Sequence, residues 1–140
     1  MTRCHRGWRR PTAEAFAARL KATRRQIAFY GSTPAYRPVL ELHGWSELAD
    51  RLHALSVTKD ESRWAAMGDL IDDDVLAAFA VVGRPAEAAA ELKRRYGDIV
   101  DRVHVPASAG LTEEEVTALV AANVVIDGDQ MPQGLATAYR

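Results

Sequence analysis

The sequence contains a single cysteine, Cys4, so no disulfide can form within the chain. Chains without disulfides suit a reducing compartment, and we therefore expect a cytoplasmic protein. No apolar run approaches the length of about 18 residues that a membrane-spanning helix requires. The basic N-terminus is followed by no apolar signal-peptide core. These absences argue against membrane-spanning and secreted classes.

Motifs for metals and nucleotides are equally scarce. Cys4, His5 and His53 share no spacing that would assemble the three or four ligands of a zinc site. Asp72, Asp73 and Asp74 are consecutive, so on a helix their side chains point in different directions. They fit better as an N-cap and first turn, where carboxylates favour the helix dipole. No glycine-rich phosphate-binding pattern occurs, and we expect no metal site.

The composition is that of an ordinary globular protein, with 48% hydrophobic and 26% charged residues, and the net charge is −1. The charge is unevenly distributed, because residues 1–25 carry eight basic residues against Glu14. This asymmetry indicates either an acidic partner or nucleic acid, or simply a solvated arm that leads into a helix with a basic outer face.

The first half of the chain shows helical spacing interrupted by strong breakers. Residues 1–11 form an arm, and Thr12 is a plausible N-cap for a helix over residues 13–30. We expect Gly31 to end this helix in a left-handed conformation. Thr33 and the following proline predict a second helix over residues 34–43, which starts either at 34 or, because of a second proline, at 37–38.

Further helices and two strands are expected downstream. Helical spacing predicts a third helix capped by Ser46, with Leu48, Leu52 and Leu55 on one face, and a fourth around Met67. Further helices are predicted over 73–79, over 86–96 with Tyr96 pointing inward, and from a capping box of Thr112 and Glu115 onward. The β-branched residues of 99–105 predict the best strand, and residues 79–82 predict a shorter one. Residues 127–140 indicate a loose tail.

Five stretches within residues 24–105 read RQIAFYGSTPAYRPVLELHGW, DDDVL, FAVVGRP, ELKRRYG and VDRV. Together they resemble the luciferase-like monooxygenases, a family of flavin- or deazaflavin-dependent oxidoreductases. The resemblance is to the C-terminal part of such enzymes. It implies an α/β, mostly helical fold that corresponds to the C-terminal portion of a (β/α)8 TIM-type barrel, with residues 12–126 as the partial barrel domain.

The same resemblance implies redox chemistry on a reduced cofactor, FMN or the deazaflavin coenzyme F-420, with a small organic molecule as substrate. A complete barrel requires about 250 residues, so we do not expect this chain alone to be active. A partial barrel leaves open strand edges, which helices or dimerisation must cover, or the fold is marginal. The partners expected are therefore a second copy of the chain or a complementing chain. The residues that the resemblance places at the barrel rim, near substrate and cofactor, are Tyr30, Ser32, Thr33, Tyr36 and Arg37. The alternative is that Tyr30 and Tyr36 are aromatics packed between helices and that Arg37 is a surface cation.

Two histidines are candidates for catalytic or capping roles. His104 lies near the C-terminal end of the predicted strand, where barrel residues meet substrate, and it is either a rim residue or a packed histidine. His43 is expected to cap a helix C-terminus. The alternative to an enzyme is a non-catalytic helical module or barrel remnant whose basic arm binds a partner or nucleic acid. No helix-turn-helix or interleaved aromatic–basic pattern supports specific DNA reading.

Overall fold

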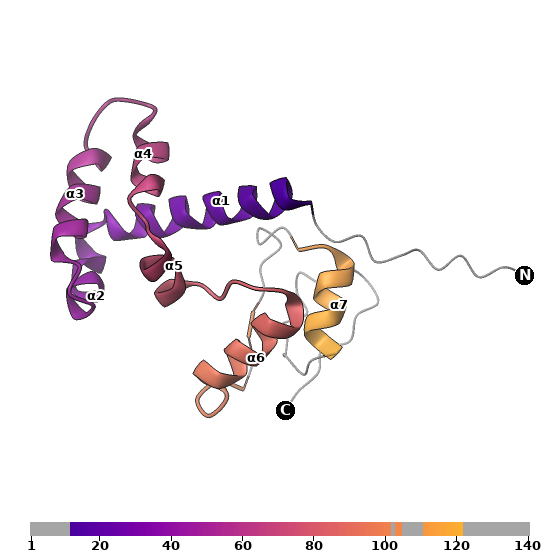
Figure 1. The fold of residues 1–140 in the computed structure, drawn as a ribbon. Coiled ribbons are helices and arrows are strands. Elements are labelled where there is room, and N and C mark those ends of the chain that lie inside the picture. Colours follow the sequence, from indigo (N-terminus) through magenta and orange to yellow (C-terminus); the bar gives the residue numbers. More distant parts are fainter. Residues whose placement is uncertain (1–11, 102, 105–110, 122–140) are drawn as a thin grey trace, which may run out of the picture. The chain divides into compact units, whose positions relative to one another are not determined.

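The computed structural model describes residues 12–101, 103–104 and 111–121, which are mostly helical (Figure 1). The predicted N-terminal arm and C-terminal tail lie outside these residues. Contacts divide the described residues into an N-terminal unit, 12–80, and a C-terminal unit, 81–121, which we describe separately. The elements are α1 (Ala13–Gly31), η1 (Pro34–Tyr36), α2 (Arg37–Leu42), α3 (Ser46–Ser56), α4 (Arg63–Asp69), α5 (Asp73–Phe79), α6 (Pro85–Tyr96) and α7 (Glu113–Ala121).

Helix α1 begins as predicted and ends differently. The Thr12 hydroxyl oxygen accepts a hydrogen bond from the Ala15 N–H at 3.1 Å, which satisfies one of the free donors at the helix start. The expected left-handed Gly31 is wrong, because Gly31 is the last helical residue and Ser32 follows with φ −77°. A Cβ at Gly31 would lie 2.9 Å from Cδ1 of Leu52. The glycine therefore provides space for the core.

The segment after α1 contains two short helices instead of one. A 3₁₀ turn precedes α2, and the helix proper starts at Arg37, which confirms the later of the two predicted starts. Gly44 has φ 78° and stops α2, and the next N–H, from Trp45, bonds to the Leu40 carbonyl at 2.9 Å. This is the hydrogen-bond pattern of a Schellman turn. Ser46 is the first helical residue of α3, so its predicted N-cap position is wrong.

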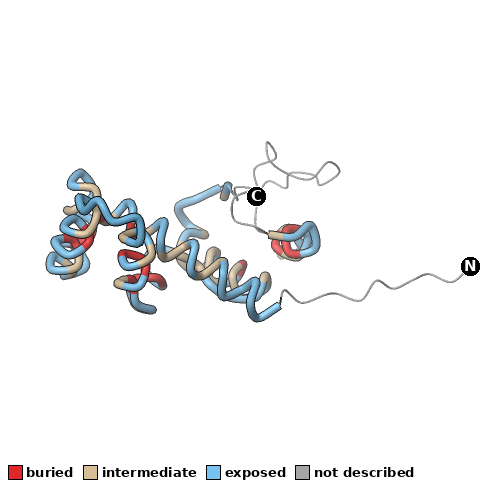
Figure 2. Tube along the Cα trace, turned by 90° about the horizontal axis from the view of Figure 1, so that it is seen from above, coloured by how far each residue is buried: buried red, intermediate tan, exposed pale blue. Residues whose placement is uncertain are grey.

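The N-terminal unit has one apolar core, and its largest fully buried side chains are Leu52, Met67 and Ile71. Buried residues lie on the inward faces of the helices and exposed ones on the outward faces (Figure 2). The predicted inward face of α3 is confirmed, since half-buried Leu48 and Leu55 pack against the same cluster as Leu52. Within the described residues, no helix combines the length and apolar character required to cross a bilayer.

Two features join α1 to the segment containing α4 and α5. Gly68 is buried where α4 packs on α1, and a Cβ placed there would lie 2.8 Å from Cγ of Arg25. Arg24 donates hydrogen bonds to the Ile71 carbonyl and to the Asp73 carboxylate. The predicted cap of α5 is confirmed, since the Asp72 carboxylate accepts from the Val75 N–H at 2.9 Å.

The C-terminal unit is built from α6 and α7, which pack through Ala89, Val116 and Leu119. The predicted capping box of α7 is confirmed. The Thr112 N–H donates to Glu115 Oε2 at 2.8 Å, and the Glu115 N–H donates to Thr112 Oγ1 at 3.2 Å. Tyr96 was expected to point inward on α6 and is instead 40% exposed.

Neither predicted strand forms in the described part of the chain. Residues 80–82 follow α5 without sheet pairing, and within 99–101 and 103–104 only Val103 makes an isolated bridge. Ile99 is 80% exposed. β-branched residues favour a strand only when another strand pairs with it, and these described residues have no neighbouring sheet.

Candidate functional site

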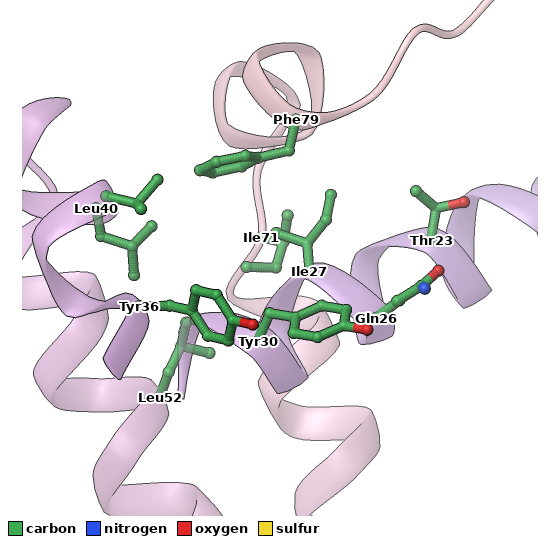
Figure 3. A pocket seen from close by; sticks show the side chains of 11 residues that line it. Thr23, Gln26, Ile27, Tyr30, Tyr36, Leu40, Leu52, Ile71 and Phe79 are labelled. Carbon is green, nitrogen blue, oxygen red and sulfur yellow. The ribbon is translucent and has the colours of Figure 1, made fainter. Parts of the chain in front are cut away.

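A pocket of about 410 Å³ opens in the N-terminal unit (Figure 3). Its walls come from α1, η1, α2, α3, the α4–α5 connection and α5. The lining residues are Thr23, Gln26, Ile27, Tyr30, Gly31, Tyr36, Val39, Leu40, Leu52, Ile71 and Phe79. Pockets that bind small molecules are concave, mostly apolar and of this size. We therefore treat this pocket as the candidate functional site.

The base of the pocket is apolar and rigidly held. Leu40, Leu52 and Ile71 are among its lining residues, and all three are buried in the core of the N-terminal unit. Their packing fixes their rotamers, because interiors of this kind are filled like organic crystals. Phe79 lines the pocket from α5 and is 40% exposed, so its ring belongs to the open part of the pocket (Figure 3).

Two tyrosines form an aromatic wall. The rings of Tyr30 and Tyr36 meet edge to face, with centroids 5.6 Å apart and planes at 87°. Each tyrosine is 47% exposed. The polar ends of Tyr30, Gln26 and Thr23 lie on the α1 side of the pocket (Figure 3). The structure thus brings together an aromatic wall and a small polar edge.

Ser32 and Thr33, two of the predicted rim residues, do not line the pocket. Their hydroxyls donate to the same acceptor, the Phe29 carbonyl, at 2.7 and 3.3 Å respectively. Ser32 is also buried, and its carbonyl lies 3.2 Å from His53 Nδ1. Both side chains thus bond to the end of α1, where a helix leaves carbonyls without internal partners.

Arg37 does not line the pocket either. Its Nε donates to Glu41 Oε1 at 2.7 Å and its Nη1 donates to Asp50 Oδ1 at 2.5 Å. These bonds raise the pKa of Arg37, with Asp50 the larger cause, and the Arg37 bond lowers the pKa of Asp50 below its ordinary 3.8. The guanidinium therefore ties α2 to α3.

The Arg37–Asp50 pair predicts a pH-dependent effect. Because the pKa of Asp50 is depressed in the folded state, its stabilising contribution is present above pH 3.8 and is lost as the pH falls through the folded-state pKa. Arg37→Gln should therefore lower the thermal unfolding midpoint slightly at neutral pH and have a smaller effect in acid. Thermal melts across this range, with NMR titration of the Asp50 carboxyl, measure both. A midpoint difference that persists unchanged in acid would contradict the pairing.

The two histidines are placed differently from each other. His104 is exposed, belongs to the C-terminal unit and does not line the pocket. His43 occupies the C-cap position of α2, as expected, and stacks on Trp45 with ring centroids 4.6 Å apart. The ring of Phe79, which lines the pocket, meets the His43 ring edge to face with centroids 5.7 Å apart. Within the described residues, no group of three or more His, Cys, Asp or Glu side chains could hold a metal ion.

Several lining residues were not identified from the sequence. Thr23, Gln26 and Ile27 share one helix face with the predicted rim residue Tyr30, since the four follow the i, i+3, i+4, i+7 spacing. That spacing marks a shared face of α1 and could have pointed to them. Phe79 was assigned only to the end of a helix or to a strand, and its role depends on contacts between distant segments.

Comparison with known proteins decides the family. A family model described as luciferase-like monooxygenase matches residues 10–102. The chain belongs to the luciferase-like monooxygenase family. The resemblance seen in the sequence motifs is therefore confirmed.

Curated relatives of this luciferase-like chain come from mycobacteria. The uncharacterized protein Rv1360 of Mycobacterium tuberculosis is 52% identical over 102 residues, and the uncharacterized protein Mb1395 of Mycobacterium bovis matches to the same extent. The match covers 73% of this chain but 29% of each relative, so the chain spans less than a third of their length. No solved structure matches.

Proposed function

We propose that this chain forms part of the substrate side of a luciferase-like oxidoreductase that uses FMN or a deazaflavin to transform a small organic molecule. The family match over residues 10–102 carries the proposal. We also propose that the chain corresponds to the C-terminal portion of a (β/α)8 barrel. A partial barrel is consistent with a chain that spans 29% of the length of its relatives. The cofactor supplies the redox step, and the protein positions the reactants.

The pocket fits a substrate better than it fits the cofactor. FMN and the deazaflavin both carry phosphate, which proteins hold with cations or with exposed N–H groups at helix starts. No charged side chain is among the pocket-lining residues of the described chain. We therefore assign no step at this pocket to the cofactor. Tyr30 and Tyr36 are the rim candidates that the proposal retains as substrate contacts.

The proposal includes the expectation that the 140-residue chain is inactive alone. Most of a barrel of about 250 residues would lie outside it, and a cofactor site assembled from several strand ends needs the others. The two rim tyrosines would then position substrate only in the presence of a complementing chain or a second copy.

A fluorescence titration tests this proposal. The purified chain should show no saturable binding of FMN or of the deazaflavin, because the described pocket lacks a phosphate partner. Adding the part of the Mycobacterium tuberculosis relative that this chain does not span should restore saturable binding. Circular dichroism of the chain alone is the control for folding. Micromolar binding by the chain alone, lost in Tyr36→Ala, would contradict the expected inactivity.

A non-catalytic helical module remains the second candidate, and one observation favours it. The N-terminal unit closes its own core from helices, without a sheet among its described residues. Such a unit could fold and bind a partner without the rest of a barrel. Failure of the mixed chains to bind either cofactor, with both chains folded, would favour this candidate over the oxidoreductase.

A further inference from the structure

We propose that the pocket of the N-terminal unit binds a neutral, largely apolar small molecule and discriminates against anions. Neither property requires a bound flavin. The inference rests on the proposed function in one respect, since it names the substrate class of the site where Tyr30 and Tyr36 lie. The argument itself depends only on the size, lining and charge environment of the pocket.

The size of the pocket selects a small molecule. Its volume of about 410 Å³ lies within the range of roughly 300–1,000 Å³ that is usual for small-molecule sites. The base is closed by buried Leu40, Leu52 and Ile71, while the partly exposed Val39 and Phe79 leave an entrance. A compact ligand can thus enter and bury much of its surface.

The lining selects an apolar body. Ile27, Leu40, Leu52 and Ile71 offer aliphatic surface, and the rings of Tyr30, Tyr36 and Phe79 offer aromatic surface (Figure 3). Apolar surface removed from water stabilises a complex by about 25 cal/mol per Å². Aromatic rings add edge and stacking contacts to a ligand ring.

The charge environment selects against anions. Within the described residues, the lining contains no cation. Two cations on helices that line the pocket bond to other groups, since Arg37 bonds to Glu41 and Asp50, and Arg24 bonds to Ile71 and Asp73. An ionised group carried into an apolar pocket without a partner is strongly penalised.

One side of the pocket can recognise a polar group on such a ligand. Tyr30 and Gln26 bring a hydroxyl and an amide, and Thr23 adds a hydroxyl whose proton is donated to the Arg19 carbonyl at 3.0 Å. The Thr23 oxygen therefore remains able to accept a hydrogen bond. These groups lie on the α1 side (Figure 3), so we expect the ligand to place a single polar group there.

Two fluorescent probes with one scaffold test the inference. N-phenyl-1-naphthylamine is neutral, and 8-anilinonaphthalene-1-sulfonate adds a sulfonate to the same framework. The full 140-residue chain should bind the neutral probe saturably and the sulfonate at least about tenfold more weakly, which corresponds to about 1.4 kcal/mol. Equal or tighter binding of the sulfonate would overturn the proposed ligand class.

A matched pair of variants locates the probe. Val39→Trp fills the pocket from α2 and should weaken binding of the neutral probe by about tenfold. Leu42→Trp introduces the same residue on the same helix at a position that is 87% exposed and outside the pocket, and should not change binding. Equal affinities in the two variants would overturn the site.

A second pair on α1 keeps the test available if Val39→Trp does not fold. Gln26→Trp fills the pocket and Ala22→Trp, an exposed position outside it, is the control. Sedimentation velocity over a range of protein concentrations shows whether the chain dimerises. Loss of the dimer in Val39→Trp would show that a second copy occupies the pocket. A dimer that Val39→Trp disrupts, together with absent probe binding, would overturn the small-molecule inference.

Cofactor binding and probe binding are measured separately, so the proposed function and the pocket inference can fail independently. Neither probe contains a flavin, so probe binding that is lost in Val39→Trp supports the pocket even if no cofactor ever binds. Conversely, cofactor binding by the mixed chains with no probe binding would overturn the pocket inference and leave the proposed oxidoreductase intact.

Discussion

Leu52→Ala should lower the free energy of unfolding by about 2–5 kcal/mol, the usual cost of truncating a buried leucine. Leu52 has no exposed surface, and its Cδ1 lies where a side chain at Gly31 would otherwise sit. The cavity left behind borders α1, α3 and the pocket, so relaxation would have to move a helix. Urea unfolding followed by circular dichroism measures the change.

Leu42→Ala is the matched control for this substitution. Leu42 is 87% exposed, so the same deletion should change the free energy of unfolding by no more than about 0.5 kcal/mol. Domains of this size are stable by only about 5–15 kcal/mol, and Leu52→Ala therefore removes a large share. Equal effects of the two substitutions would show that the core does not form in solution.

Gly68→Leu is expected to have the second-largest effect, because it would push α1 and α4 apart. A Cβ at Gly68 would lie 2.8 Å from Arg25 Cγ and 3.6 Å from Arg25 Cα. The Cγ could move with the side chain, but the further carbons of leucine would meet the backbone of α1. Overpacking of this kind costs about 1–3 kcal/mol and occasionally more.

The higher helix propensity of leucine opposes the steric cost of Gly68→Leu, so the variant needs a control for propensity. Replacing a helical glycine by leucine favours the helix by up to about 1 kcal/mol, which offsets part of the steric cost. Ala66→Leu, at an exposed position of the same helix, shows the effect of leucine without the contact with α1. We expect Gly68→Leu to unfold at lower temperature than wild type while Ala66→Leu does not. A stabilised Gly68→Leu variant would contradict the close packing.

Local signals in the sequence predicted most of the helices correctly. Thr12, Asp72 and the Thr112–Glu115 pair each bond to backbone groups within three residues, and such bonds depend only on neighbouring sequence. The prolines at 34 and 38 also predicted the break between α1 and α2, because proline restricts the backbone locally. What depends on a partner far along the chain was missed, including the two strands and the spatial role of Gly31 and Gly68.

The candidate site was predicted only in part. Tyr30 and Tyr36 were named as rim residues and do meet in the pocket. Arg37 was named either as a rim residue or as a surface cation, and its guanidinium bonds to Asp50, thirteen residues away. The sequence could not rank these outcomes, because whether an arginine is available depends on which carboxylates the folded chain brings to it.

The bonds of Arg24 to Ile71 and to Asp73, the first residue of α5, can form only late in the synthesis of the N-terminal unit. Arg24 and Asp73 are separated by 49 positions, so α1 leaves the ribosome well before its partners. At about 5–20 residues per second, this interval is on the order of seconds, long compared with the formation of a helix. Until α4 and α5 emerge, α1 can pack only on η1 and α3, and the part of its surface that α4 and α5 cover is open to aggregation or to a chaperone.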